Sequence, residues 1–151
     1  MTARTLQSAA RLCQEKGLAF TLLRRQVYEL IAAETTPVGA YDLLDRLKQQ
    51  RANAAPVTVY RTLDFLQDAG LVHRIDALQA YAACEVHGHS EHEATDHGGL
   101  VLVCSRCKQL TEFEDDTLEH QIERAASRRG FQVAHRLIEI RGLCGRCAAT
   151  A

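Results

Sequence analysis

The sequence predicts an α+β fold, in which a helical N-terminal domain precedes a small C-terminal α/β domain with a four-cysteine zinc site. Apolar residues recur at helical spacing through the first 70 residues, and short β-type runs dominate the remainder. Four cysteines form two Cys-x-x-Cys pairs in the second part. We therefore expect a winged-helix domain over residues 1–83, a histidine-rich hinge over 84–99 and a metal-binding domain over 100–151.

Four helices are expected in the first 70 residues. Gly17 and Gly70 are placed to end the first and fourth helices. Thr21 is placed to cap the second helix, and Pro56 to begin the fourth. The apolar stripes of the helices are Leu6, Ala9, Ala10 and Cys13; Leu23, Val27, Leu30 and Ile31; Ala40, Leu43, Leu44 and Leu47; and Val59, Leu63 and Leu66. On its stripe, Cys13 is expected to be a buried thiol rather than a redox switch.

Two β-type runs follow the helices, at residues 71–75 and 81–84, with a polar turn between them. Helices followed by a hairpin in this order are typical of a winged helix-turn-helix domain. The C-terminal part is expected to form a small α/β unit with strands at 100–104 and 110–113, a helix at 115–130 and a final strand at 131–141. Each Cys-x-x-Cys pair then lies at the end of a strand.

The composition excludes several classes of protein. An apolar content of 46% suffices for a core, and scarce proline argues against disorder. No apolar run approaches the roughly 20 residues that span a bilayer, and the N-terminus lacks the apolar segment of a signal peptide. We therefore expect a cytoplasmic protein whose cysteines stay reduced and bind metal rather than form disulfides. The net charge of −1 does not by itself indicate nucleic acid.

The paired cysteines, Cys104 with Cys107 and Cys144 with Cys147, predict a structural zinc site. Four thiolates complete a tetrahedral shell and leave no open position, which suits a metal that stays bound. A thioredoxin-like redox pair competes with this interpretation, but neither pair begins a helix within a βαβ unit. A zinc hydrolase or thiol-disulfide enzyme is a further alternative, for which the sequence offers no convincing pair of nucleophile and base.

The fourth helix carries side chains that suit contact with DNA. When Val59 and Leu63 face the core, Thr58 and Arg61 lie on the outer face with Tyr60 beside them. Arginine can bind a guanine edge or a phosphate, and threonine or tyrosine can bind a phosphate or a thymine methyl group. An ordinary amphipathic helix with a solvated arginine explains the same pattern.

Three segments together resemble the ferric uptake regulator (Fur) family. They are residues 56–72, the first cysteine pair with the Glu112–Asp115 segment, and residues 130–147 with the second pair. The resemblance covers nearly the whole chain, and residues 40–45 are typical of the zinc uptake regulator (Zur) branch. It implies a homodimeric, metal-dependent transcription factor without enzymatic activity. The N-terminal winged helix would bind AT-rich palindromic DNA, and the C-terminal α/β domain would dimerise.

The resemblance also implies a second, regulatory zinc site, so that each protomer would bind at least two zinc ions. Its ligands would be His73, Cys84, His97 and Glu112. Zinc there would clamp the two domains and favour the DNA-binding conformation. The gap between Cys84 and His97 is longer than in the branch, so His87, His89 or His92 is an alternative ligand to His97. A thiolate ligand favours zinc over iron, although an iron- or peroxide-responsive regulator of the same family stays the alternative.

Further roles follow from the resemblance or from composition. Arg24 matches the position of an arginine that contacts the DNA backbone in the family. Asp45 and Lys48 match positions that join neighbouring dimers, so that two dimers can share one operator. His120 and His135, with the hinge histidines, are candidates for an extra zinc site, and a solvent-exposed loop explains the hinge histidines equally well.

Overall fold

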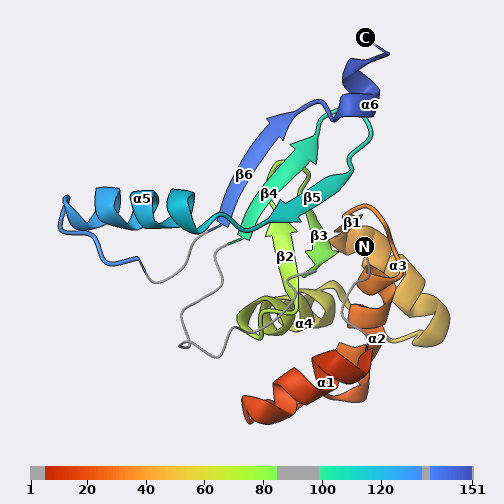
Figure 1. Cartoon of the computed structure of the whole chain (residues 1–151). Helices are drawn as coiled ribbons and strands as arrows, with labels where there is room; N and C mark the ends of the chain where they lie inside the picture. The colour runs from red at the N-terminus through yellow and green to blue at the C-terminus, as the bar shows by residue number, and fades with distance from the viewer. Residues whose placement is uncertain (1–5, 85–98, 134–136, 151) are drawn as a thin grey trace. The chain divides into compact units, whose positions relative to one another are not determined.

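The computed structural model describes residues 6–84, 99–133 and 137–150 (Figure 1). By its internal contacts the chain divides into two compact units, Met1–Glu85 and Val86–Ala151. The domain boundary expected at residue 83 and the hinge expected over 84–99 stay predictions, because most of the hinge lies outside the described residues. None of the described helices combines the length and the apolar character needed to cross a membrane.

The described part of the first unit contains four helices and a three-stranded antiparallel sheet. The helices are α1 (Leu6–Glu15), α2 (Leu22–Ala32), α3 (Ala40–Gln50) and α4 (Pro56–Asp68), and the strands are β1 (Val38–Gly39), β2 (Val72–Ile75) and β3 (Ala80–Ala83). The strands lie in the order β1-β3-β2. The expected helices and hairpin are confirmed. Strand β1 was not expected, because two residues are too few to leave an alternating pattern.

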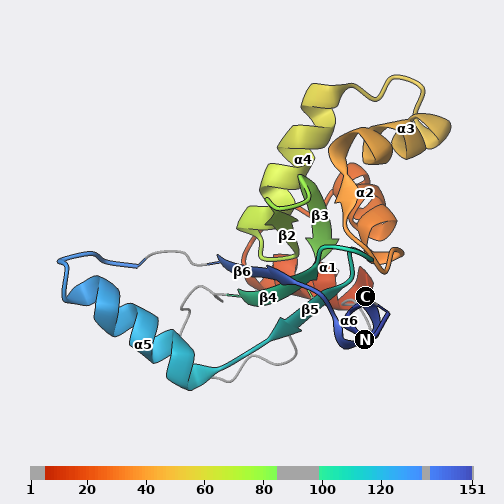
Figure 2. The same cartoon turned by 90° about the horizontal axis from the view of Figure 1, so that it is seen from above.

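The apolar stripes of the four helices meet in one core. Its most deeply buried members include Ala9, Val27, Leu43, Leu47, Leu63 and Leu66. The expected helix boundaries are also present. Thr21 caps α2 by accepting a hydrogen bond from the Arg24 amide, Pro56 opens α4, and Gly70 follows α4 with φ +73°. Helices α3 and α4 form the helix-turn-helix, and the hairpin β2–β3 follows α4 as the wing (Figure 2).

The second unit is built on a three-stranded sheet with the order β5-β4-β6. Its elements are β4 (Gly99–Cys104), β5 (Leu110–Phe113), α5 (Asp116–Ser127), β6 (Leu137–Gly142) and the short α6 (Gly145–Ala148). Strand β5 pairs with β4 antiparallel and β6 pairs with β4 parallel. The final strand expected from residue 131 begins only at Leu137 in the described residues, and residues 131–133 lie outside any strand. Phe131 and Val133, which the expected strand includes, therefore precede β6.

Several large apolar side chains are exposed among the described residues of the second unit. Helix α5 has an apolar stripe, yet none of its described residues is buried. In both views it extends away from the sheet of its own unit (Figures 1 and 2). On the sheet, Leu102 of β4 is paired with Ile140 of β6, and these side chains are 40% and 44% exposed. An α/β unit normally buries such a face against another layer.

Candidate metal centres and recognition helix

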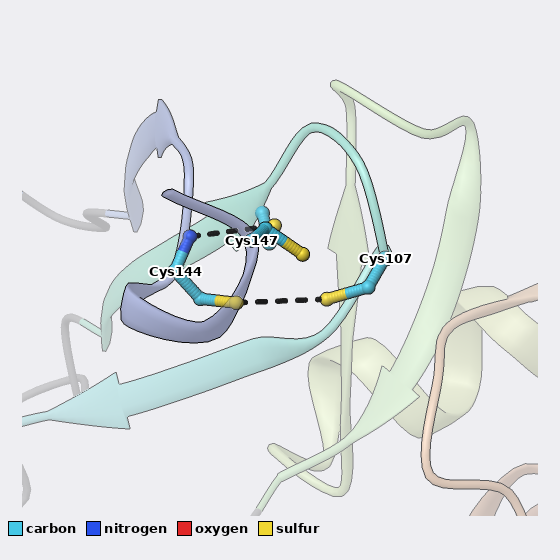
Figure 3. Close-up of side chains that lie close together, drawn as sticks. Cys107, Cys144 and Cys147 are labelled. Carbon is cyan, nitrogen blue, oxygen red and sulfur yellow. Dashed lines mark hydrogen bonds between the residues drawn. The ribbon is translucent and has the colours of Figure 1, made fainter. Parts of the chain in front are cut away.

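The four paired cysteines converge at one end of the second sheet. Cys104 ends β4, Cys107 lies in the turn before β5, Cys144 caps α6, and Cys147 lies within α6. Their sulfur atoms all lie within 4.8 Å of one another. Figure 3 shows the side chains of Cys107, Cys144 and Cys147 pointing toward a common centre.

The sulfur spacing fits a zinc ion better than it fits a disulfide. The Sγ atoms of Cys107 and Cys144 lie 3.8 Å apart, and all four thiols are free. A disulfide requires an S–S distance of about 2.05 Å. A tetrahedral zinc ion with Zn–S bonds of about 2.3 Å spaces its sulfurs about 3.8 Å apart. The donor set and its spacing therefore fit a closed, four-thiolate zinc site.

Hydrogen bonds set the acidity of these sulfurs. The backbone N–H of Cys144 donates to the Sγ of Cys104 at 3.4 Å. This bond, with a weaker contribution from the backbone of Cys107, lowers the pKa of the Cys104 thiol to about 5. Hydrogen bonding with the Cys144 side chain raises the pKa of Cys147 to about 12. The cluster thus favours a thiolate beside a thiol, and metal binding displaces protons from such thiols.

A second pair of donors lies on the wing of the first unit. His73 is on β2, and Cys84 immediately follows β3. His73 pairs with Ala82, so Cys84 is its diagonal neighbour on the same face of the hairpin. A ring nitrogen of His73 lies within 4.8 Å of the Cys84 sulfur, which is a buried thiol. One imidazole and one thiolate at this spacing can provide half of a tetrahedral zinc site.

The other predicted ligands of the regulatory site belong to the second unit, so the first unit alone supplies only His73 and Cys84. Glu112 is half-buried on β5 of the second unit. His97, with the alternative ligands His87, His89 and His92, lies outside the described residues, as does His135. His120 is exposed on α5, where its Nδ1 lies 2.7 Å from the Asp116 carbonyl oxygen. The structure thus describes half of the predicted regulatory set as one local pair.

The outer face of α4 presents the side chains expected to bind DNA. Tyr60 is 41% exposed and Arg61 is also exposed, whereas Thr58 is half-buried. Arg24 of α2 lies against this helix, with its guanidinium carbon 3.4 Å from the centre of the Phe65 ring. The same guanidinium donates to the Ala19 carbonyl oxygen. The arginine is therefore held in one position beside α4.

Two further expectations concern α3 and α1. Asp45 is exposed and Lys48 is exposed near the end of α3, where a neighbouring molecule can reach both. Cys13 is fully buried in the core of the first unit, as expected. Burial raises the pKa of the Cys13 thiol, against smaller opposing effects of Arg24 and Lys16. A thiol that stays protonated is a poor nucleophile, which agrees with a packing role.

Most of the chain matches one known family. A family model described as the ferric uptake regulator family matches residues 15–141. The chain belongs to the ferric uptake regulator family. Members of the Fur family are transcription regulators, so the enzyme alternatives raised by the cysteine pairs are set aside.

Several Fur-family proteins are similar to this chain over nearly its whole length. The zinc uptake regulation protein of Escherichia coli K12 is 32% identical over 146 residues, which cover 97% of this chain and 82% of that protein. A solved zinc uptake regulator complexed with zinc and DNA has a TM-score of 0.86 and 31% identity, with 96% and 93% of the two chains covered. Holo XcZur has a TM-score of 0.81 and 40% identity, with 95% and 96% covered.

Fur-family members with other names match as well. The ferric uptake regulation protein of Klebsiella pneumoniae is 31% identical over 140 residues, which cover 91% of this chain and 86% of that protein. The peroxide operon regulator of Bacillus subtilis is 26% identical over 148 residues, which cover 98% and 97%. Overall sequence identity thus shows the family but does not distinguish which metal the protein binds, which depends on the ligand residues.

Sequence reasoning missed two arginines that join the cysteine turns of this Fur-family protein. Arg106 and Arg146 each donate hydrogen bonds from one turn to the other. The signal that could have found them is a repeat within the motif, because both pairs read Cys-x-Arg-Cys. Which groups an arginine reaches depends on the folded turns, so the repeat alone gives no partner.

Proposed function

We propose that this protein is a zinc-responsive transcriptional repressor of zinc uptake genes, acting on DNA as a homodimer in the cytoplasm. The observation that carries the proposal is the pair His73 and Cys84, whose donor atoms lie within 4.8 Å on the wing. A thiolate beside an imidazole selects zinc over iron, which prefers nitrogen and oxygen ligands in such sensors. The likeness to zinc uptake regulators supports the same metal.

We infer at least two zinc ions per protomer, with different duties. Cys104, Cys107, Cys144 and Cys147 hold a structural ion, because four thiolates satisfy the metal fully and leave no position for exchange. His73, Cys84, His97 and Glu112 hold the regulatory ion, with His87, His89 or His92 as the alternative to His97. An extra site at His120 and His135 would add a further ion, which a count of zinc per protomer detects.

Helix α4 is proposed to enter the major groove. Arg61 and Tyr60 project from its exposed face, and Thr58 lies beside them. Arg24, held against Phe65, is placed to meet a phosphate next to that groove. A homodimer has two such helices, so it reads a palindrome, here proposed to be AT-rich. Asp45 and Lys48 would join two dimers that share one operator.

The exposed apolar side chains of the second unit support dimerisation through that unit. Leu102 and Ile140 lie side by side on the sheet and are both exposed. The described residues of α5 include none that is buried, although the helix is amphipathic. A second copy that covers this pair and the apolar stripe of α5 removes these side chains from water. The dimer then carries two winged helices on one rigid base.

Regulation follows as a population shift. Zinc that joins ligands of the winged helix to ligands of the dimerisation domain restricts the positions that the two recognition helices sample. Zinc that binds the DNA-competent arrangement about 100-fold better than the others shifts the equilibrium by about 2.7 kcal/mol. The zinc-loaded dimer then occupies its operator and blocks transcription.

The variant Cys84→Ser tests this proposal. We expect a folded dimer that retains the structural zinc and has lost zinc-dependent binding to a duplex selected in vitro by the zinc-loaded protein. Cys13→Ala is the matched control, because Cys13 is also a buried thiol of the first unit but lies in the apolar core. A mobility shift with buffered zinc measures both variants. If Cys84→Ser binds DNA with the zinc dependence of the wild type, the regulatory assignment is wrong.

An iron- or peroxide-responsive regulator is the second candidate. The observation in its favour is the 31% identity to a ferric uptake regulation protein, which is close to the 32% found for a zinc regulator. The two candidates differ in the metal that restores DNA binding to chelated protein. Restoration by Fe²⁺ at concentrations where Zn²⁺ has no effect would favour this candidate.

A further inference from the structure

The two cysteine turns are tied to each other by arginines as well as by their sulfurs. Each turn has the sequence Cys-x-Arg-Cys, so that Arg106 and Arg146 occupy equivalent positions. Each arginine reaches across to the opposite turn. This reciprocal arrangement, Arg106 to the second turn and Arg146 to the first, is called the arginine clasp below.

Arg106 forms the first half of the clasp with α6 and with Thr150, which follows that helix. Arg106 Nη1 donates to the Cys147 carbonyl oxygen at 2.8 Å and to the Thr150 hydroxyl oxygen at 3.0 Å. The Thr150 hydroxyl also lies 3.2 Å from the same carbonyl oxygen as a donor. The guanidinium thus satisfies a carbonyl at the C-terminal end of α6, where a positive charge is favoured. It holds α6, and Cys147 with it, against the first turn.

The second half of the clasp returns from α6 to the first turn. Arg146 Nη2 donates to the Gln109 side-chain oxygen at 2.5 Å. Gln109 belongs to the first turn, because its carbonyl oxygen accepts the Cys104 backbone N–H at 3.0 Å. A backbone bond from Ser105 N–H to the Gly142 carbonyl oxygen, 2.8 Å long, joins the same two segments. The two turns are therefore connected by both arginines and by the backbone, outside the sulfur cluster.

The charges of the clasp complement the metal that the cluster fits. Four thiolates around one Zn²⁺ carry a net charge of about −2, and the two guanidinium groups supply about +2 within the two turns. Groups that surround a ligand shell orient the ligands, and their loss commonly costs about 10–100-fold in metal affinity. The hydrogen bonds matter beyond charge, because they fix the relative position of the two halves of the site.

We propose that Arg106 and Arg146 are positioning residues that hold the two halves of the four-cysteine site together and slow the loss of its zinc. The proposal rests on the proposed structural zinc at the four cysteines. The clasp acts on the rate at which the site opens: a chelator removes zinc after one turn separates from the other, and both arginines oppose that separation. The structural ion thereby stays bound while the regulatory ion exchanges.

Zinc release from the native dimer tests the clasp. Wild type, Arg106→Met and Arg146→Met are loaded with zinc, and a colorimetric chelator follows the release of the slow ion. We expect release at least about tenfold faster for each arginine variant. Gln109→Leu removes the acceptor of Arg146 without changing the charge, so it should accelerate release as much as Arg146→Met does. The double variant Gln109→Leu/Arg146→Met should then be no faster than either single variant.

Arg141→Met is the matched control, because Arg141 is an exposed arginine on β6 of the same unit and its loss removes the same charge. It should release zinc within about twofold of the wild type. Release rates of Arg106→Met, Arg146→Met and Gln109→Leu equal to that of the wild type would overturn the clasp. Equal acceleration by Arg141→Met would overturn it too, since charge alone would then suffice. A wild type without slowly released zinc would instead contradict the proposed structural site.

Discussion

At the scale of residues, three cysteines differ in their chemistry because their surroundings differ. Cys13 lies in an apolar core, where burial raises the pKa of its thiol. Cys104 accepts hydrogen bonds from backbone N–H groups, which lower its pKa to about 5. Cys84 lies beside an imidazole on the wing. The packing role of Cys13 and the proposed structural and regulatory roles of the other two cysteines thus follow from their neighbours rather than from the residue type.

Cys104→Ser should destabilise the second unit and the dimer. Loss of one thiolate opens the shell of a metal whose binding contributes on the order of 10 kcal/mol in small zinc peptides. The loss should therefore exceed the about 1 kcal/mol of a typical substitution. Thermal unfolding and sedimentation measure stability and assembly, with exposed Ser105→Ala as the control. A fully stable, dimeric Cys104→Ser protein would contradict the structural role.

At the scale of elements, sequence patterns predicted the long elements well. The apolar stripes of α1–α4 pack against one another and form one buried core, to which all four helices contribute. The two-residue strand β1 and the four-residue helix α6 left no periodic signal, because a pattern of apolar residues needs a longer element to repeat. Strand β6 starts later than expected. Short elements are fixed by tertiary neighbours, which a local pattern does not contain.

The candidate sites were predictable to different degrees for the same reason. The four-cysteine cluster was predictable because each pair carries its own spacing. The pair of His73 and Cys84 was assigned only through the family resemblance, since they become neighbours when the hairpin register is set. The arginine clasp depends on two turns that lie far apart in the sequence, since Arg106 and Cys147 are 41 positions apart. No local spacing encodes such a contact.

The exposed face of α4 gives a prediction at this scale. Arg61→Ala should leave thermal stability within about 0.5 kcal/mol of the wild type, because the side chain is exposed. It should weaken DNA binding by about 1–3 kcal/mol if the arginine binds a guanine edge. If Arg61 binds a phosphate, the variant should instead lower the salt dependence by about one ion. Arg11→Ala on α1, also exposed, is the control. DNA affinity of Arg61→Ala equal to that of Arg11→Ala would contradict the assignment of α4.

At the scale of the whole molecule, the two units differ in how well one chain covers their apolar surface. The first unit has a buried core of its own, whereas the described residues of the second unit include an exposed pair, Leu102 and Ile140, and a helix α5 with no buried residue. A palindromic operator requires two recognition helices with a fixed spacing. A dimer formed through the second unit would cover the exposed apolar side chains of that unit. It would also bring two winged helices together, as a palindromic operator requires.

Charge at the exposed pair Leu102 and Ile140 should separate the protomers. We expect Leu102→Glu with Ile140→Glu to give a monomer, because the pair is exposed in one chain and would be buried in the dimer. Leu22→Glu is the control, since Leu22 is 63% exposed in the first unit. Light scattering measures the molar mass of each variant. A dimeric double variant would place the interface elsewhere.

The central claim is that one zinc ion stabilises the second unit, whereas another makes DNA binding depend on the concentration of free zinc. Metal counting beside a DNA-binding titration in buffered zinc tests it most directly. We predict one tightly held zinc ion per protomer without DNA binding at low free zinc. A further ion should bind over the same range in which operator binding appears, and Fe²⁺ should not replace it. Operator binding that is independent of zinc occupancy, or that only Fe²⁺ restores, would contradict the account.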